Sequence, residues 1–599
     1  MEGVYNKKAN KMKKLIFLDI EEFKKLKDSD KKNIILLDYL PKDFSDLSLK
    51  SIEKFNIEEF FPASLLKNIK KRYEELFNEF YKIVDKKIIY KDVDLFFVIK
   101  NDLFLSFYKY VKYMDILNYI IKKNNPKEIF IKYNESKEEN KFLDNPELSV
   151  SIIKEICYVK KIPLKIKIIK NKKRSINKNL KTYLINILGV LQNMHFKIMN
   201  LKRSKKKNIL FVGGKNAYLP LLKDMKGKVK ITRCGTSVGQ AFFDNDQDYY
   251  ITFWNKPKIK NVKLYKSKII KNLRSMKYKG ISFYNIFLPD LNYLFDAHFK
   301  ILMRWIDKIY KIEPHISTVV TTNDTLTLEQ IIIKILKKNK KKSYVIQHGY
   351  TTLSEGFFPL IKNKMLADKM FVWGKTSKEW MVKEGLKKEN LIITGSIKFD
   401  EYIEDGGIID LKRKFNISKN KKIIFFIPEA NNDLICHLSH KELPEFYRIL
   451  FSTVNKMKEF ILFVKLHPSD KYLKLPEEIL REEKADNVSI LEKNFPLKPL
   501  LKQSDLIISL GSTVTLEAMF FKKPILIANF FNKESIVPFV ENNMCVGINN
   551  KNKLKQYIIN SIKNSDELVK KYEKRFKDYV LIDGNAHKKM SNIILNRKI

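Results

Sequence analysis

Two histidines stand at the ends of apolar segments that are typical of buried β-strands. His348 follows residues 343–347, and His467 follows residues 460–466. Because α/β proteins bind ligands at the carboxyl ends of their parallel strands, both imidazoles are candidates for a ligand site. Such an imidazole can act as a general base or hydrogen-bond a phosphate, and Gly349 beside His348 allows a close approach of backbone or substrate. The alternative for each is a purely structural histidine at a strand end.

A third candidate is a hydroxyl-rich turn between an apolar strand, residues 506–509, and a predicted helix. Gly511, Ser512 and Thr513 form the turn, and Glu517 follows one helical turn later. Hydroxyl groups and free backbone N–H groups at the start of a helix bind anions, and a carboxylate nearby could accept from ribose hydroxyls. We therefore expect a phosphate site here, with a plain N-cap by Ser512 or Thr513 as the alternative.

The elements that must position these residues alternate between strands and helices from about residue 207 onward. This alternation predicts an α/β protein with two doubly wound Rossmann-like domains, residues 207–400 and 408–599, joined by an acidic, Gly-rich hinge. In the first domain, Gly213 and Gly214 follow a short strand. They either approach an acceptor or make a tight turn between strand and helix.

An additional α/β domain is expected over residues 1–167, followed by a basic connector over residues 168–206. Within this N-terminal domain, residues 127–166 read as strand, loop, helix and strand. Residues 317–347 have the same layout, which indicates either an internal duplication or a feature common to Rossmann-like units.

The net charge of +48 is unevenly distributed. Residues 156–223 contain 18 basic residues and residues 249–289 contain ten, and neither window contains an acid. Arg, which is preferred for base and phosphate recognition, is scarce beside Lys, so a specific nucleic-acid reader is not expected. We expect the two windows to favour an anionic membrane surface, with a lysine-rich overall composition as the simpler explanation.

Cysteine usage and hydropathy exclude several other classes of protein. The four cysteines are widely spaced with no CxxC pair, which argues against a disulfide scaffold or a zinc module. No secretory signal is readable, and no apolar run reaches the roughly 18–20 residues that span a bilayer. The expected location is the cytoplasm, peripheral to the inner face of the cell membrane.

The order of the motifs resembles that of GT-B glycosyltransferases over residues 207–599. The nearest groups are the bacterial CDP-glycerol glycerophosphotransferases and the capsule or surface-polysaccharide transferases, including those that use CMP-activated nonulosonic acids. The segments that carry the resemblance are Gln347-His348-Gly349, Trp373-Gly374, Ile393-Thr394-Gly395, His467-Pro468 and Gly511-Ser512-Thr513 with Glu517 and Lys523-Pro524.

The resemblance implies roles for individual residues. His467, Ser512 and Thr513 would hold the donor phosphates, and Glu517 the ribose. His348 would be the general base for an acceptor hydroxyl, with Asp324 on the adjacent strand-end loop as the rival base. No metal or cofactor is implied. The chain departs from the pattern by lacking a Trp before His348 and a clear Arg-rich donor clamp.

The expected function is therefore transfer of a sugar or polyol phosphate from a CMP- or CDP-linked donor to a glycan or lipid-linked acceptor of the cell surface. One alternative keeps the fold: a non-hydrolysing UDP-N-acetylglucosamine 2-epimerase. A second alternative is a basic binding scaffold built on an inactive transferase fold, which would bind anions in a strongly salt-dependent manner.

Overall fold

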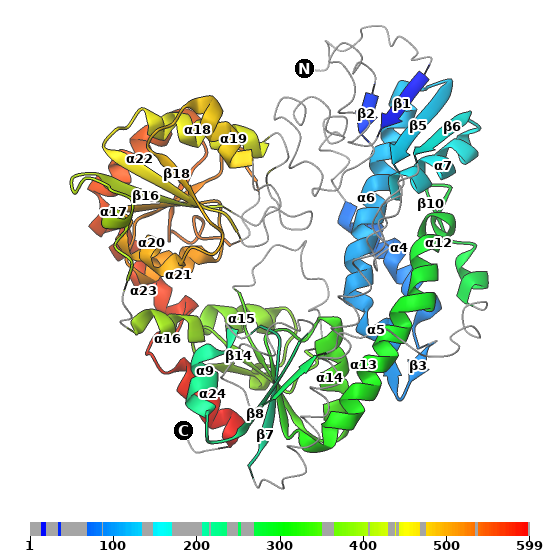
Figure 1. Ribbon diagram of the computed structural model, residues 1–599, viewed down its shortest axis with the longest axis horizontal. Helices are drawn as coiled ribbons and strands as arrows, with labels where there is room; N and C mark the ends of the chain where they lie inside the picture. The colour runs from blue at the N-terminus through cyan, green and yellow to red at the C-terminus, as the bar shows by residue number, and fades with distance from the viewer. Residues whose placement is uncertain are drawn as a thin grey trace.

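Three parallel sheets organise the protein in the computed structural model (Figure 1). The structure describes residues 14–18, 34–36, 69–86, 88–134, 148–169, 206–214, 217–235, 249–252, 269–349, 365–404, 408–428, 438, 442–467, 475–533 and 537–596. In Figure 1 the N-terminal and C-terminal sheets lie at opposite sides, above a central seven-stranded sheet. The protein is thus α/β, with two doubly wound domains preceded by a further α/β unit, as the sequence predicts.

The central sheet has the strand order β15-β14-β13-β12-β7-β8-β9, in which all strands are parallel. Strands β7, β8, β12 and β13 are largely buried, as expected for a sheet covered on both faces. The order reverses between β7 and β12, which is the switch point where doubly wound folds bind ligands. The strands are β7 (Asn208–Val212), β8 (Lys230–Gly235), β9 (Tyr249–Thr252), β12 (Thr318–Thr321), β13 (Lys342–Ile346), β14 (Lys369–Val372) and β15 (Leu391–Ile393).

Helices on both faces complete this domain. One of them, α13, continues from α12 through a short π-helical segment, η5 (Leu294–His298), and forms a long rod. The helices are α9 (Leu219–Met225), α12 (Phe283–Tyr293), α13 (Phe299–Ile312), α14 (Thr327–Lys338), α15 (Lys375–Lys383) and α16 (Ile397–Ile403). Short 3₁₀ turns are η6 (Glu313–His315) and η7 (Lys388–Asn390).

The C-terminal sheet has the order β18-β17-β16-β19-β20-β21, again with its reversal beside the first strand. Its strands are β16 (Lys422–Ile427), β17 (Phe460–Lys465), β18 (Val488–Leu491), β19 (Leu506–Ser509), β20 (Ile525–Ala528) and β21 (Val546–Ile548). Its helices are α17 (Leu411–Lys414), α18 (Glu442–Asn455), α19 (Leu475–Glu483), α20 (Leu497–Gln503), α21 (Val514–Phe520), α22 (Leu554–Lys563) and α23 (Ser565–Tyr579), with a 3₁₀ turn η8 (Lys551–Lys553).

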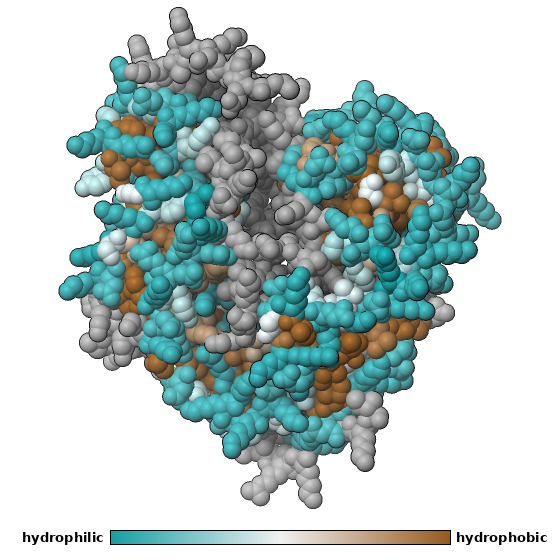
Figure 2. Space-filling model, turned by 180° about the vertical axis from the view of Figure 1, so that it is seen from behind, coloured by the Kyte–Doolittle hydropathy of each residue, from teal (hydrophilic) through white to brown (hydrophobic). Residues whose placement is uncertain are grey.

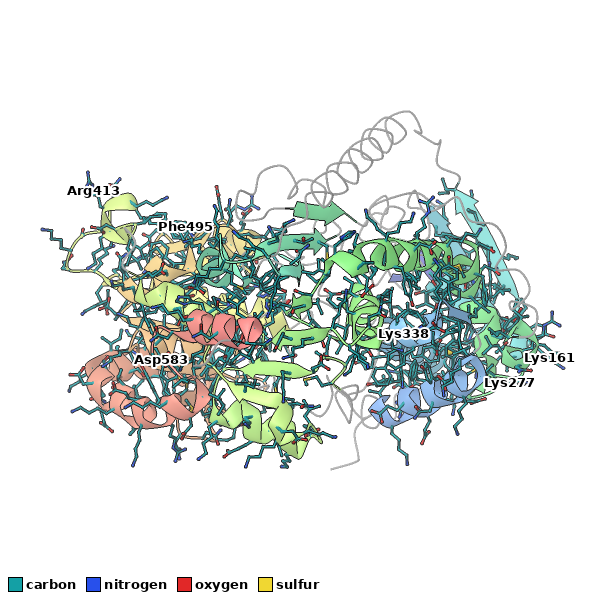
Figure 3. The ribbon with its side chains drawn as sticks, turned by 90° about the horizontal axis from the view of Figure 1, so that it is seen from below. Lys161, Lys277, Lys338, Arg413, Phe495 and Asp583 are labelled. Carbon is teal, nitrogen blue, oxygen red and sulfur yellow. The ribbon has the colours of Figure 1, made fainter. Side chains whose placement is uncertain are left out.

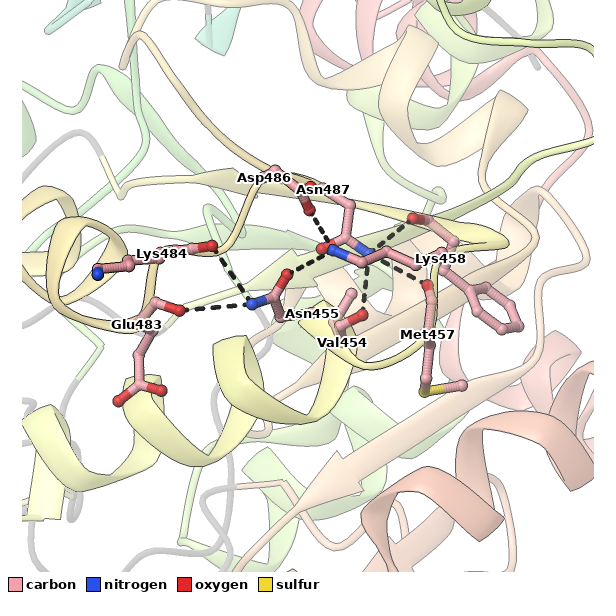
Figure 4. A network of polar contacts seen from close by, with 9 residues as sticks. Val454, Asn455, Met457, Lys458, Glu483, Lys484, Asp486 and Asn487 are labelled. Atoms are coloured by element: carbon pink, nitrogen blue, oxygen red, sulfur yellow. Dashed lines mark hydrogen bonds and ion pairs between the residues drawn. The ribbon is translucent and has the colours of Figure 1, made fainter.

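The amino edge of this sheet is held by a buried amide. Asn487 Nδ2 donates to the carbonyl oxygens of Val454 (2.8 Å), Met457 (3.1 Å) and Phe460 (3.1 Å), and so fastens the turn between α18 and β17 (Figure 4). The ion pair between Lys458 and Asp486 (2.6 Å) lies beside it. The side chains at this edge are engaged in structural contacts. Ligands of open α/β sheets bind at the carboxyl edge, so we expect the site there.

The chain returns to the central domain at its end. The backbone from Asp578 to Leu581 crosses two glycines: a side chain at Gly374 would lie 2.5 Å from the carbonyl oxygen of Asp578, and Gly395 has φ +88°. Helix α24 (Ala586–Leu595) then packs against α9 and α16. This crossing explains physically why glycine is needed after Trp373 and Thr394, at two of the motif positions.

The N-terminal unit has a four-stranded parallel sheet of order β2-β1-β5-β6. The strands are β1 (Lys14–Leu18), β2 (Ile34–Leu36), β5 (Glu128–Asn134) and β6 (Leu164–Ile169); the helices are α4 (Ile69–Val84), α5 (Leu95–Val98), α6 (Lys100–Asn124) and α7 (Leu148–Lys160). A small hairpin, β3 (Ile89–Tyr90) and β4 (Val93–Asp94), precedes α5.

This unit repeats the first part of the central domain. Strands β8-β7-β12-β13 have the same order and direction as β2-β1-β5-β6, and a second hairpin, β10 (Lys277–Tyr278) and β11 (Ile281–Ser282), precedes α12. The common order agrees both with an internal duplication and with a feature common to Rossmann-like units. Residues 170–205 of the expected connector and residues 405–407 of the expected hinge lie outside the described residues, and the domain boundaries remain predictions.

The two repeats pack face to face through reciprocal contacts. Tyr90 of the first hairpin donates to Asp307 on α13 (2.9 Å), while Tyr278 of the second hairpin donates to Asp115 on α6 (3.1 Å). Lys91 and Lys279, the residues that follow these tyrosines, pair with the same two carboxylates, each at 2.5 Å. Aromatic pairs fill the space between, including Phe107–Phe283 at 4.8 Å and Phe96–Phe299 at 5.1 Å between ring centroids.

Among the coloured residues on the back of the molecule, most of the surface is hydrophilic, with hydrophobic residues in smaller areas between them (Figure 2). Among the described residues, no helix is both long enough and apolar enough to span a bilayer.

Candidate functional site

His348 lies at the carboxyl edge of the central sheet, two residues after β13. Its side chain is accessible to solvent, yet surrounding protein removes part of its hydration, and this desolvation lowers the pKa of the imidazole below its usual value. The charge of Lys398 lowers that pKa further. A lowered pKa keeps the imidazole neutral at physiological pH, which is the form that accepts a proton.

The strand end that carries His348 is fixed by Gln347, a buried residue whose role the sequence does not reveal. Its side-chain amide donates to the carbonyl oxygen of Gly349 (3.0 Å) and to the Ser377 hydroxyl (3.1 Å), and its Oε1 accepts from the backbone N–H of Trp373 (2.8 Å). The Trp373 indole in turn donates to the Gln347 carbonyl oxygen (3.0 Å). These bonds join the ends of β13 and β14 and hold the backbone on which His348 stands.

Asp324 follows β12 at the same edge of the sheet, and its carboxylate accepts hydrogen bonds from backbone N–H groups. Its Oδ2 accepts from the N–H groups of Leu366 (2.7 Å) and Ala367 (3.3 Å), just before β14. Burial raises the pKa of the carboxyl, while the two N–H groups act in the opposite direction. The geometry therefore gives Asp324 a role in shaping the chain that enters β14, beside its predicted role as a rival base.

The three glycines predicted near the acceptor face open space. A side-chain carbon added at Gly213, Gly214 or Gly349 would meet no atom of the described residues within 4 Å. Gly213 has φ +105°, a conformation that favours glycine, at the switch point after β7. The open surroundings suit an edge at which a ligand approaches the backbone.

The corresponding turn of the C-terminal sheet has the same backbone feature. Gly511, two residues after β19, has φ +109°. The Ser509 hydroxyl oxygen accepts from the Gly511 N–H (3.1 Å) and from the Thr515 hydroxyl (3.1 Å), which shapes the turn. Ser512 and Thr513 lie in this turn and are partly accessible, before the short helix α21.

His467 lies after β17, at the same edge of the C-terminal sheet, and is partly buried. Desolvation lowers the pKa of its imidazole, and the charges of Lys465 and Lys493 lower it further. Two cations near one imidazole create a locally positive environment, which favours an anionic ligand. Pro468, the other residue of this motif, lies outside the described residues.

Glu517 is held by two residues that its sequence position does not reveal. Its Oε1 is 2.6 Å from Lys398 Nζ, and its Oε2 accepts a hydrogen bond from the Tyr402 hydroxyl. Its side chain is only 5% exposed. Lys398 and Tyr402 come from α16, whereas Glu517 is on α21, so this contact joins the central domain to the C-terminal domain.

Lys398 connects the two sheet edges electrostatically. Its charge lowers the pKa of His348 at the end of β13 and that of Lys465 at the end of β17, although burial is the larger cause in both. The charge of Lys398 therefore acts on groups at the ends of both β13 and β17. Lys398 and Tyr402 leave no signal in the sequence, whereas Lys465 could have been noticed as a charged residue closing an apolar strand.

Among the described residues, no group of three or more His, Cys, Asp or Glu side chains could hold a metal ion.

Residues 359–596 match the family model described as CDP-Glycerol:Poly(glycerophosphate) glycerophosphotransferase. The matched region contains His467, the Ser512–Thr513 turn and Glu517, and it begins after His348. No curated protein has a matching sequence.

Solved structures with a similar arrangement include UDP-GlcNAc 2-epimerase from Neisseria meningitidis bound to UDP-GlcNAc. It is 17% identical, with a TM-score of 0.42 over 65% of this chain and 100% of that chain. A variant of the wall teichoic acid polymerase TagF is 12% identical, with a TM-score of 0.41 over 71% of this chain and 98% of that chain. The resemblance predicted from the motif order is confirmed over residues 359–596, which match the CDP-glycerol:poly(glycerophosphate) glycerophosphotransferase family model.

Proposed function

We propose that the protein transfers glycerol phosphate from CDP-glycerol to a hydroxyl group of a cell-surface polymer. The family match supports the donor and the reaction class. The observation that carries the proposal is the ion pair between Lys398 and Glu517 (2.6 Å), which joins α16 of the domain that contains His348 to α21 of the domain that contains His467. A transferase needs a base and a donor-phosphate site close together, and a contact between the two domains supports such an arrangement.

In this reaction the acceptor oxygen forms a bond to the β-phosphorus of the donor. The bond between that phosphorus and the bridging oxygen breaks, and CMP leaves with the electron pair. The proton of the acceptor hydroxyl passes to the neutral imidazole of His348. Asp324 is the less suitable base because its Oδ2 already accepts two backbone N–H groups. Base catalysis of this kind contributes roughly 10²–10⁴-fold to the rate.

The donor phosphates would lie at the C-terminal edge. His467 and Lys465 supply positive charge or hydrogen-bond donors there, and Ser512 and Thr513 supply hydroxyl groups in the turn after β19. Positive groups fixed at the position of the leaving phosphate stabilise the charge that develops as CMP departs.

A surface of the N-terminal unit supports docking to an anionic membrane, where such an acceptor would be synthesised. Tyr158 and Val159 at the end of α7 are 82% and 46% exposed, and Ile168 on β6 is 48% exposed. Exposed lysines surround these apolar residues: Lys154, Lys160, Lys161, Lys165 and Lys167. Figure 3 shows Lys161 and Lys277, which belong to the two acid-free windows, at the same end of the molecule. Exposed apolar side chains among lysines favour an anionic bilayer.

The experiment is a nucleotide panel followed by turnover. Thermal unfolding of the wild-type chain would be measured with CMP, CDP, UDP and GDP, and CMP release would then be measured with CDP-glycerol and an acceptor polymer. We expect stabilisation by the cytidine nucleotides and CMP release that depends on the acceptor. Preference for UDP would favour the epimerase alternative, and the absence of any nucleotide response would contradict the donor site.

A further inference from the structure

We propose that Lys398 and Lys465 together bind the pyrophosphate of the donor, and that Glu517 acts by holding Lys398 in place. This inference rests on the proposed function and assigns to Glu517 a positioning role instead of the ribose contact expected from the family resemblance. Residues of both domains would then form the donor site, because Lys398 lies on α16 and Lys465 on β17.

The geometry around Glu517 supports the positioning role. Each carboxylate oxygen has a partner, Lys398 at 2.6 Å for Oε1 and the Tyr402 hydroxyl for Oε2. The Glu517 side chain is 5% exposed, whereas that of Lys398 is 47% exposed. The member of this pair that a ligand can reach is therefore the lysine, while the buried carboxylate fixes its ammonium group at the domain junction.

The charges around this pair favour an anion. Lys465 is the last residue of β17, at the carboxyl edge of the C-terminal sheet, and is partly buried. Burial lowers its pKa, the charge of Lys398 lowers that pKa further, and Glu517 acts in the opposite direction. Two cations held near each other disfavour one another, and an anion placed between them relieves that repulsion. A pyrophosphate, with a negative charge on each phosphate, is the part of the donor that matches two lysines.

The test is calorimetric titration of the full chain with CDP and with cytidine, which lacks phosphate. The variants are Lys398→Met, Glu517→Gln, the double variant and Lys398→Arg. Lys422→Met is the matched control, because Lys422 forms a comparable ion pair with Asp505 (3.1 Å) at the opposite edge of the sheet. Unchanged circular dichroism and melting temperature show that each variant is folded.

We expect Lys398→Met to weaken CDP binding by about tenfold or more, because a charged hydrogen bond to phosphate is lost. Lys398→Arg should retain most of the affinity. Glu517→Gln should weaken CDP binding in the wild-type background but add nothing to Lys398→Met, since it acts through that lysine. Cytidine affinity should be the same in all variants, and Lys422→Met should bind CDP like the wild type.

A loss of cytidine affinity in Glu517→Gln, or an additive loss in the double variant, would overturn the positioning role and favour a ribose contact. Wild-type CDP affinity in Lys398→Met would overturn the lysine site while leaving the proposed function intact. If the wild-type chain does not bind CDP at all, the proposed function itself is contradicted. The three results are therefore distinguishable.

Discussion

The N-terminal unit and the first part of the central domain have the same scaffold, but only one of them ends in a candidate catalytic group. Both have four parallel strands in the same order and a hairpin before a long helical segment. In the central copy the fourth strand leads to His348. In the N-terminal copy β6 ends at Ile169, and the sequence continues with Lys170, Asn171 and Lys172, with no histidine in the corresponding position. The comparison shows that this scaffold alone does not make a site, since the chemistry depends on the side chains just beyond the strand end.

The two copies also differ in how they use their faces. Their long helices bury aromatic side chains against each other, so each copy covers the apolar face of the other. The central copy additionally contacts the C-terminal domain through α16. The N-terminal copy thus serves as a packing partner of the central copy.

The largest effect that separates the copies is expected from His348. We predict that His348→Ala lowers turnover by roughly 10²–10⁴-fold while CDP affinity is retained, because the base is lost and the donor site is not. Asp324→Asn should mainly lower the melting temperature, since it weakens the acceptor of two backbone N–H groups. For both variants, CMP release measures turnover, titration with CDP measures donor affinity, and thermal unfolding measures the melting temperature. If His348→Ala retained full turnover and Asp324→Asn lost it, Asp324 and not His348 would be the general base.

The next effect concerns the reciprocal carboxylates that join the copies. The Asp115 side chain is fully buried and pairs with Arg72 (2.9 Å) and Lys279, whereas Asp307 is 31% exposed. We expect Asp115→Asn to destabilise the protein by about 2–4 kcal/mol, because it leaves two cations without their partner, and Asp307→Asn by about 1 kcal/mol or less. Thermal unfolding compares the two, and equal losses would show that the contacts are energetically symmetric.

A smaller effect, on membrane binding, is expected from Tyr158 and Val159 at the end of α7 in the N-terminal copy. Tyr158 on α7 is 82% exposed, whereas Leu336 near the end of α14, the corresponding helix of the central copy, is buried. Replacing Tyr158 and Val159 by Ser should reduce flotation with anionic liposomes by a few-fold and leave CDP binding unchanged. Lys571→Ser, on α23 of the C-terminal domain, is the control. If the wild-type protein floated equally with neutral and anionic liposomes, the lysines would reflect the lysine-rich composition of the chain and would not indicate membrane binding.

Much of this fold follows from local pattern. Strand β19 has the predicted bounds, residues 506–509, because it is a short, continuous apolar run that is buried throughout. Strand β8 could not be predicted in this way because Thr232 and Arg233 interrupt its apolar pattern, although both are buried in the sheet. The two-residue strands of the hairpins are too short to produce an alternating pattern.

The candidate site is less predictable, since its residues meet only in the folded chain. The apolar segments before His348 and His467 predicted that both histidines lie at the carboxyl ends of parallel strands. The structure places both at the carboxyl edges of their sheets. The partners of Glu517 could not be predicted, because Lys398 and Tyr402 precede it by more than a hundred residues and belong to another helix. A carboxylate in the first turn of a helix carries no local mark that distinguishes a ligand contact from an ion pair.

The most direct test of one composite site is the titration of His348 followed by NMR of histidine ring carbons, with and without CDP. The His348→Ala variant assigns the signal. Because the charge of Lys398 helps to lower the pKa of His348, a bound pyrophosphate should offset that charge and raise this pKa. A rise in the pKa of His348 on saturation with CDP is the predicted result. A response of His467 with no change at His348 would show that the two edges are independent, and would contradict the account.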